Sequence, residues 1–146
     1  MNGNLKDEPP DGNLTAKSPT ENSAIRVLVV DDHKIVREGL ASLLAEQKGI
    51  EVVGQAGNGR EAVNLALKLH PAVVIMDVSM PLMNGDEATR QICKLMPETR
   101  VIALSMFEED ETMQRMFRAG AEGYVLKTAP SEELFAAIRG TKNATD

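Results

Sequence analysis

Short apolar runs alternate with longer amphipathic segments along most of the chain. Five of these runs are rich in β-branched or other apolar residues, which is typical of buried strands. The predicted strands span residues 25–30, 50–56, 72–76, 101–104 and 123–126. The segments that follow them place apolar residues three and four positions apart, a spacing that predicts helices. The predicted helices span about 34–47, 58–70, 85–96, 109–119 and a last segment that opens at Pro130.

Local signals mark the ends of several of these helices. Gly49 is a natural stop after the first helix, and Pro71 ends the second. Asn58 and Glu61 stand three residues apart, the spacing of an N-cap residue and a glutamate that reaches back to it. These signals agree with the boundaries that the apolar pattern predicts.

Five strands alternating with five helices predict a doubly wound α/β fold, in which helices cover both faces of a parallel sheet. We expect the flavodoxin-like strand order 2-1-3-4-5, in which strands one and three flank the point where the order reverses. Residues 25–140 are predicted to form this single domain. The segment 1–24 is rich in Pro, Asn, Asp, Ser and Thr and is predicted to be a disordered tail, with 141–146 as a C-terminal tail or linker.

Composition and charge narrow the functional classes. The 146 residues carry a formal net charge of −6 without a basic cluster, so we expect no nucleic-acid surface on this chain. No apolar run approaches the roughly 18–20 residues that a membrane span needs, and the N-terminus lacks the pattern of a signal peptide. The single cysteine, Cys93, excludes an intrachain disulfide. Together these features predict a cytoplasmic protein without membrane contact.

Chemically active side chains gather at the carboxyl ends of the predicted strands. The first strand ends in Asp31 and Asp32, the third in Asp77 and the fourth in Ser105, while Lys127 closely follows the fifth. These ends share one edge of an open parallel sheet, which is where ligands bind. Three converging carboxylates repel one another, and all-oxygen ligation with few protein groups suits Mg²⁺. A carboxylate beside such a cation can act as the nucleophile toward a phosphoryl group.

Each of these residues has a plainer explanation when it is taken alone. An Asp at a strand-to-helix junction is often a helix cap, a single Ser or Lys is often solvated, and Asp77 could begin a turn. Their position on one shared edge is what favours a functional site. His33, His70 and Cys93 are set aside, because the histidines have no partner at metal-ligand spacing and the cysteine lies on a predicted helix.

Taken in order, four segments resemble the receiver domain of bacterial response regulators, the CheY-like family. They are VVDDH at 29–33, MDVSMPLMNG at 76–85, ALSM at 103–106 and GAEGYVLK at 120–127. The resemblance covers about residues 25–139 and looks closest to the NarL/FixJ subfamily of two-component regulators. It implies the same doubly wound fold that the alternation of strands and helices predicts.

The resemblance also implies roles for the acidic residues. Asp77 matches the phosphoacceptor of the family. Asp31 and Asp32 match the acidic pair that organises Mg²⁺, and the backbone carbonyl of Ser79 matches a further metal ligand. The implied phosphoryl donor is a sensor histidine kinase or a phosphotransfer protein.

Three further positions match residues that respond to the phosphoryl group. Ser105 matches the hydroxyl residue that hydrogen-bonds it, and Lys127 matches the lysine that contacts it. Tyr124 matches the aromatic residue whose rotamer is coupled to that hydroxyl. The implied result is a conformational switch rather than enzymatic turnover, and a homodimer through the receiver is a further partner that the resemblance allows.

The output of the switch stays open at this point. NarL/FixJ members usually carry a C-terminal helix-turn-helix, so the chain is interpreted as the regulatory part of a DNA-binding transcription regulator or as a stand-alone regulator or phosphorelay protein. A remoter alternative is an aspartyl-nucleophile phosphohydrolase, which would place a second acid where this chain has Ser79. A pseudo-receiver that only binds partners is disfavoured, because no acid is missing and the lysine is present.

Overall fold

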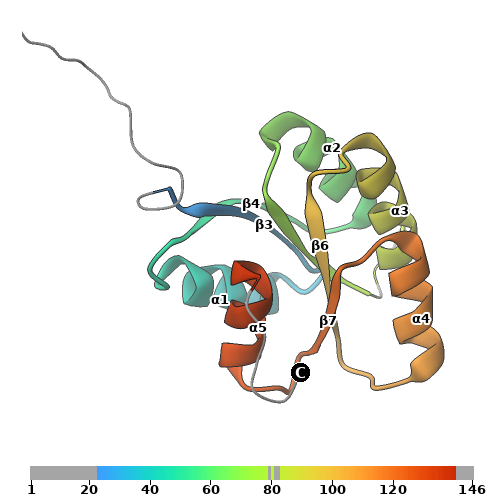
Figure 1. The fold of residues 1–146 in the computed structure, drawn as a ribbon. Helices are drawn as coiled ribbons and strands as arrows, with labels where there is room; N and C mark the ends of the chain where they lie inside the picture. The colour runs from blue at the N-terminus through green and yellow to red at the C-terminus, as the bar shows by residue number, and fades with distance from the viewer. Residues whose placement is uncertain (1–22, 79, 81–82, 141–146) are drawn as a thin grey trace, which may run out of the picture.

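A five-stranded parallel sheet lies between two layers of helices in the computed structural model, which describes residues 23–78, 80 and 83–140 (Figure 1). The strands are β3 (Ile25–Val30), β4 (Ile50–Ala56), β5 (Val73–Asp77), β6 (Arg100–Ser105) and β7 (Gly123–Leu126). The helices are α1 (Lys34–Ala45), α2 (Gly59–Leu69), α3 (Gly85–Leu95), α4 (Asp110–Ala119) and α5 (Ser131–Arg139). Nearly all of the predicted N-terminal tail, and the predicted C-terminal segment 141–146, lie outside the described residues.

The strands are arranged in the order β4-β3-β5-β6-β7, and all neighbouring pairs are parallel. In chain order this is 2-1-3-4-5, so the predicted fold class is confirmed. The order reverses between β3 and β5, where Val30 pairs with Met76. Because the register aligns these two residues, Asp31 and Asp77 emerge next to each other from the same edge of the sheet.

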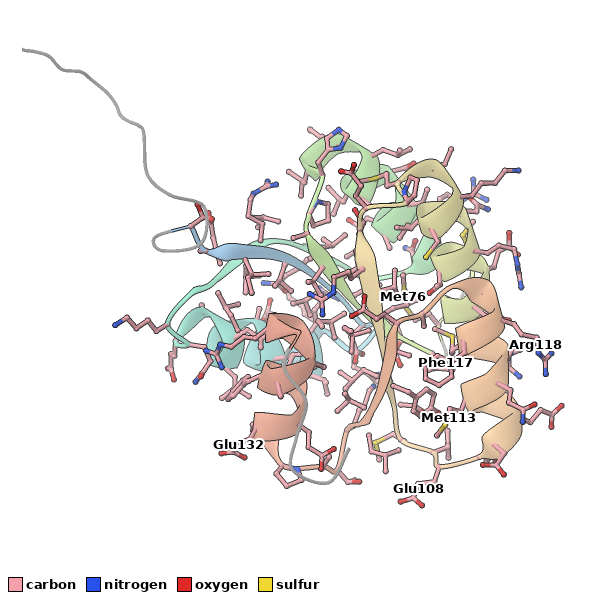
Figure 2. The ribbon with its side chains drawn as sticks, viewed as in Figure 1. Met76, Glu108, Met113, Phe117, Arg118 and Glu132 are labelled. Carbon is pink, nitrogen blue, oxygen red and sulfur yellow. The ribbon has the colours of Figure 1, made fainter. Side chains whose placement is uncertain are left out.

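Alternate residues of the central strands face opposite layers of helices, as the two-residue period of a strand requires. Val27 and Val29 pack with the apolar residues of α1 and α5, whereas Leu28 and Val30 pack with those of α2, α3 and α4. Met76 of β5 belongs to the same cluster of buried residues as Leu28 and Val30 and is fully buried (Figure 2). Full burial of each large apolar side chain contributes about 1.5–3 kcal/mol, so the two clusters hold both layers firmly on the sheet.

The N-cap positions of α1 and α2 are occupied by residues other than Asp31 and Asp32. Asn58 caps α2 by accepting a hydrogen bond from the backbone N–H of Glu61 at 2.8 Å, which confirms Asn58 as the predicted cap. The Glu61 carboxylate reaches back one residue further than predicted and accepts from the N–H of Gly57 at 2.8 Å. The residue at the N-cap of α1 is His33, and its side chain makes no capping hydrogen bond. Neither member of the Asp31–Asp32 pair occupies the cap position. None of the described helices is long and apolar enough to cross a membrane.

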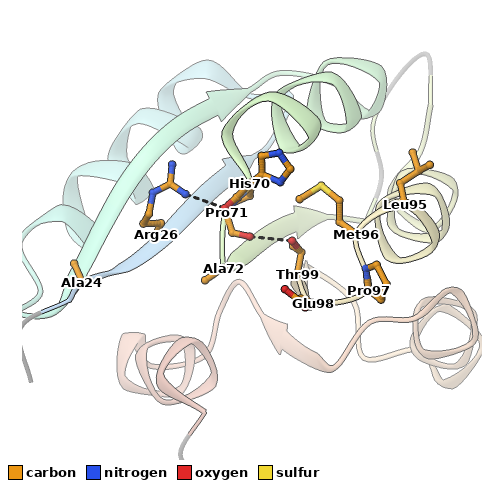
Figure 3. Close-up of a pocket in the computed structure, with 10 residues that line it drawn as sticks. All are labelled: Ala24, Arg26, His70, Pro71, Ala72, Leu95, Met96, Pro97, Glu98 and Thr99. Carbon is orange, nitrogen blue, oxygen red and sulfur yellow. Dashed lines mark hydrogen bonds between the residues drawn. The ribbon is translucent and has the colours of Figure 1, made fainter. Parts of the chain in front are cut away.

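A hollow of about 530 Å³ lies at the opposite edge of the sheet, beside the amino-terminal ends of the strands (Figure 3). The Arg26 guanidinium donates a hydrogen bond to the carbonyl of His70 at 2.8 Å. The buried hydroxyl of Thr99 donates to the carbonyl of Pro71 at 2.9 Å. The first hydrogen bond ties β3 to the end of α2, and the second ties the segment that leads into β6 to the segment that leads into β5, so these polar groups have a structural role.

Candidate functional site

Two carboxylates are buried side by side at the carboxyl edge of the sheet. Asp31 directly follows β3 and is 0% exposed, and Asp77 ends β5 and is 4% exposed. Carboxylate oxygens of Asp31, Asp32 and Asp77 and a ring nitrogen of His33 lie within 4.8 Å of one another. Burying several negative charges together is costly unless cations compensate them.

Lys127 supplies one such cation. Its Nζ donates a hydrogen bond to Asp31 Oδ2 at 2.9 Å and lies 3.3 Å from Asp77 Oδ1. Burial tends to lower the pKa of Lys127, but the hydrogen bond to Asp31 and the charge of Asp77 outweigh burial and raise it. The ammonium therefore remains charged between the two carboxylates.

One lysine does not balance the charge of three carboxylates, and the pKa of Asp77 is raised as a result. Burial, and after it the charge of Asp31, raise the pKa of Asp77 from 3.8 to about 6. Lys127 acts in the opposite direction, and a hydrogen bond with Asp32 adds to the rise. The site therefore keeps an excess of negative charge at neutral pH, which favours the binding of a further cation.

The two neighbouring acids differ in which of their oxygens are engaged. Asp31 Oδ1 accepts a hydrogen bond from the backbone N–H of His33 at 2.9 Å, while its Oδ2 accepts from Lys127. Asp32 Oδ1 is shielded from solvent and has no hydrogen-bond partner among the described residues. His33 Nδ1 lies 3.1 Å from this oxygen without a directed hydrogen bond, so the carboxylates of Asp32 and Asp77 still fit as ligands of a divalent cation. The predicted ligand Ser79 lies outside the described residues.

The remaining predicted residues meet at the backbone of Phe107. The Ser105 hydroxyl accepts a hydrogen bond from the Phe107 N–H at 3.0 Å and donates to the Phe107 carbonyl at 3.4 Å. The Tyr124 hydroxyl donates to the same carbonyl at 2.8 Å. The ring of Tyr124 lies 6.4 Å from that of Phe117, which points from α4 toward β7 (Figure 2). Ser105 and Tyr124 are thus linked through one shared acceptor.

A cavity of about 300 Å³ opens over these groups and gives a small ligand access to Asp77. It is lined by residues from the ends of β5 and β6 and from the loops after β3, β5, β6 and β7: Asp32, His33, Asp77, Val78, Ser105, Met106, Phe107 and Lys127. The structure therefore brings Asp32, Asp77, Ser105 and Lys127 to one cavity, with Asp31 behind them in contact with the lysine.

The prediction that His33 has no partner at metal-ligand spacing is wrong, because its ring lies beside the acidic pair. Its Nδ1 forms a hydrogen bond with Asp31 Oδ1 at 3.3 Å and lies 3.1 Å from Asp32 Oδ1. The available signal was its place directly after the acidic pair at a strand end. Cys93 lies apart on α3, where its thiol donates to the Gly120 carbonyl at 3.5 Å and burial raises the pKa of the thiol.

Several known proteins are similar to this chain in sequence and in fold. The response regulator receiver domain matches residues 27–139. The chain is 46% identical over 115 residues to the transcriptional regulatory protein LiaR of Bacillus subtilis and 47% identical over 115 residues to the response regulator GacA of Pseudomonas aeruginosa. In both cases the match covers 79% of this chain and 54% of the other protein. The chain therefore spans about half the length of these relatives.

Solved structures agree with this assignment. The response regulator domain of CheB from Thermotoga maritima is 38% identical, with a TM-score of 0.75, over 81% of this chain and 96% of that chain. A LuxR-family two-component response regulator from Aurantimonas sp. SI85-9A1 is 35% identical, with a TM-score of 0.76, over 82% of this chain and 89% of that chain. By sequence and by fold, this chain belongs to the family of response regulator receiver domains of two-component systems.

Proposed function

We propose that the chain accepts a phosphoryl group on Asp77 and thereby changes the surface formed by α4, β7 and α5. The observation that carries this proposal is the position of Asp77 in a cavity, with Lys127 on one side and the acidic pair on the other. This arrangement offers a nucleophile, a cation for the phosphoryl oxygens and a place for a divalent metal.

In the proposed reaction an Asp77 carboxylate oxygen attacks the phosphorus of a phosphohistidine or of a small acyl phosphate. The new O–P bond forms as the bond from phosphorus to the donor breaks, and the donor leaves with that electron pair. The nucleophile must be ionised, and a pKa of about 6 leaves Asp77 about nine-tenths ionised at pH 7. Lys127, whose raised pKa keeps it charged, is placed to pair with an oxygen of the transferred group.

Mg²⁺ is the proposed cofactor, and Asp32 and Asp77 are the side chains that would hold it. Ser79 would add its backbone carbonyl, as the family resemblance implies. Asp31 would act through a water molecule, because both of its oxygens already accept hydrogen bonds. When bound, the cation supplies positive charge that offsets the repulsion between the acids and the incoming phosphoryl oxygens.

The proposed switch follows from the new charge. A phosphoryl group adds about −1.5 to −2 charge, which draws the Lys127 ammonium away from Asp31 and the Ser105 hydroxyl away from Phe107. A shift from 1:99 to 99:1 requires about 5.5 kcal/mol of differential binding. One charge-assisted hydrogen bond contributes about 1.5–3 kcal/mol, so Ser105 and Lys127 must act together. Loss of the Ser105 contact leaves the Phe107 carbonyl to Tyr124 and alters the surface beside α4.

The proposed donor is a histidine kinase or a phosphotransfer protein in the cytoplasm, and a homodimer through the receiver is a further proposed partner. We also propose that the receiver regulates transcription, because relatives such as LiaR are transcriptional regulators. A stand-alone regulator or phosphorelay protein is the alternative output. The sequence of the gene after codon 146 tests this point, since a helix-turn-helix there would support control of transcription.

Acetyl phosphate with and without Mg²⁺ tests the phosphorylation itself, with intact-protein mass spectrometry as the readout. We expect one Mg²⁺-dependent phosphoryl group on the wild type and none on Asp77→Asn. Asp86→Asn is a matched control, because Asp86 lies in the first turn of α3 and pairs with Arg115 at 3.2 Å. Equal modification of Asp77→Asn and the wild type would exclude Asp77 as the acceptor.

A further inference from the structure

The Arg37 side chain folds back from the first turns of α1 onto the segment that carries the acidic pair. Its Nη1 donates a hydrogen bond to the backbone carbonyl of Asp31 at 2.9 Å, and its Nε donates to Gln55 Oε1 of β4 at 3.2 Å. A Cβ at Gly57 would lie only 3.2 Å from Nη1, so the guanidinium is closely packed. Arg37 therefore links α1, the edge strand β4 and the acidic end of β3.

Each polar group of Asp31 is engaged by a different part of the molecule. Its N–H donates to the carbonyl of Ala56 at 3.1 Å, and its own carbonyl accepts from Arg37. Its Oδ1 accepts from the backbone N–H of His33 at 2.9 Å, and its Oδ2 accepts from Lys127 at 2.9 Å. Arg37 is thus the side chain that holds the carbonyl of this residue.

These hydrogen bonds also fix the backbone of Asp32, because they hold the peptide groups on both sides of it. The preceding peptide carries the Asp31 carbonyl, which Arg37 holds, and the following peptide carries the His33 N–H, which Asp31 Oδ1 holds. Since a peptide group is planar, holding both peptides fixes φ and ψ of Asp32 and the direction of its Cα–Cβ bond. The Asp32 side chain lines the cavity together with Asp77, so the two backbone hydrogen bonds direct it there.

We propose that Arg37 is a positioning residue for phosphoryl transfer: it holds the peptide within the acidic pair, so that the Asp32 carboxylate faces the cavity beside Asp77. Arg37 itself does not line that cavity, so it acts through the backbone. The planar guanidinium is suited to this task, because its fixed set of donors can hold the carbonyl of Asp31 and Gln55 at once. The inference rests on the proposed function in one respect, namely that Asp32 holds a cation.

The sign of the effect on Mg²⁺ binding separates positioning from charge. Arg37 is a cation near a site that is proposed to hold another cation, so removal of its charge alone should strengthen Mg²⁺ binding. Loss of positioning should instead weaken it, as is typical of groups that orient metal ligands. Arg37→Met keeps an apolar side chain but removes the guanidinium. We expect it to bind Mg²⁺ at least about tenfold more weakly than the wild type in isothermal titration calorimetry of the full chain.

Arg26→Met is the matched control, because the Arg26 guanidinium also donates to a backbone carbonyl, that of His70, at 2.8 Å. This contact lies at the opposite edge of the sheet, so Arg26→Met should bind Mg²⁺ within about twofold of the wild type. A second readout needs no metal. In metal-free protein, the His33 amide hydrogen should exchange at least about fivefold faster in Arg37→Met than in Arg26→Met, as measured by nuclear magnetic resonance.

Gln55→Met keeps the inference testable if Arg37→Met does not fold. It removes the acceptor of Arg37 Nε at an exposed position of β4 and leaves the charge of Arg37 in place. The guanidinium is then held by one partner fewer, and we expect Mg²⁺ affinity to fall at least about threefold. Wild-type affinity in Gln55→Met would in that case overturn the inference.

Mg²⁺ affinity in Arg37→Met that equals or exceeds that of the wild type would overturn the inference, and so would an equal loss in Arg26→Met. Asp32→Asn separates the inference from the proposed function. If Asp32→Asn loses Mg²⁺ binding and Arg37→Met does not, only the role of Arg37 is wrong. If Asp32→Asn binds Mg²⁺ as the wild type does, the cation assignment in the proposed function is wrong. Exchange of the His33 amide then decides the role of Arg37, and equal rates in the two arginine variants would overturn it.

Discussion

The Asp77→Asn substitution removes a charge that the folded protein holds at a cost. The pKa of Asp77 is raised from 3.8 to about 6, first by burial and then by the charge of Asp31. The folded protein therefore binds this proton more tightly than the unfolded chain does. Stability falls as the pH rises from about 4 to about 6, and the full cost is present above that range. A shift of about two pKa units corresponds to about 3 kcal/mol.

An asparagine resembles the neutral acid, so we expect Asp77→Asn to raise the free energy of unfolding by about 2–3 kcal/mol at neutral pH without divalent cations. Urea denaturation followed by far-UV circular dichroism measures this difference. The gain should nearly disappear at about pH 4, where the wild-type carboxyl is protonated in the folded protein. The control Asp86→Asn breaks a partly exposed ion pair with Arg115 and should lose no more than about 1 kcal/mol.

Mg²⁺ provides a second arm of this experiment. A ligand that binds only the folded wild type stabilises it by about 2.7 kcal/mol at a hundred times its dissociation constant, so Mg²⁺ should narrow the gap between the two proteins. The reasoning would be refuted if Asp77→Asn were no more stable than the wild type at neutral pH. It would also be refuted if the gain at about pH 4 were as large as the gain at neutral pH.

Two further substitutions test the ion pair between Lys127 and Asp31 and the close contact between Gly59 and Met83. Lys127→Ala leaves the fully buried Asp31 without its cation, and we expect a loss of about 3–5 kcal/mol in urea denaturation without divalent cations; a loss below about 1 kcal/mol would argue against this pairing. Gly59→Ala places a Cβ against the carbonyl oxygen of Met83, and we expect a lower melting temperature from about 1–3 kcal/mol of overpacking. Gly39→Ala in α1 is its control, because that Cβ meets nothing within 4 Å and should stabilise the helix by about 0.5–1 kcal/mol; equal melting temperatures for the two variants would contradict the predicted clash.

The fold was largely predictable because each element has its own apolar period. The predicted strands at 25–30, 50–56 and 123–126 coincide with β3, β4 and β7, since a buried strand requires apolar residues that a turn does not. The meeting of Asp31 and Asp77 followed from strand order, because parallel strands bring their carboxyl ends to one edge.

The partners of individual side chains at the site were not predictable from the sequence. Lys127 pairs with Asp31 across 96 positions of the chain, and the pairing depends on how deeply the acid is buried. The carbonyl of Phe107 serves as a common acceptor only because the loop after β6 turns back on Ser105. His33 joins the acids through a side-chain orientation that spacing along the chain does not reveal. Such contacts depend on rotamers and burial, which a pattern of residue types does not specify.

Locating the modified residue tests the assignment of Asp77 most directly. Borohydride reduces an aspartyl phosphate to homoserine, so the wild-type chain is treated with acetyl phosphate and Mg²⁺, reduced, digested and mapped by peptide mass spectrometry. We predict homoserine at position 77, only when Mg²⁺ is present, and unmodified Asp31 and Asp32. Homoserine at position 31 or 32, or at none of the three positions after phosphoryl uptake, would contradict the proposal that Asp77 is the phosphoacceptor.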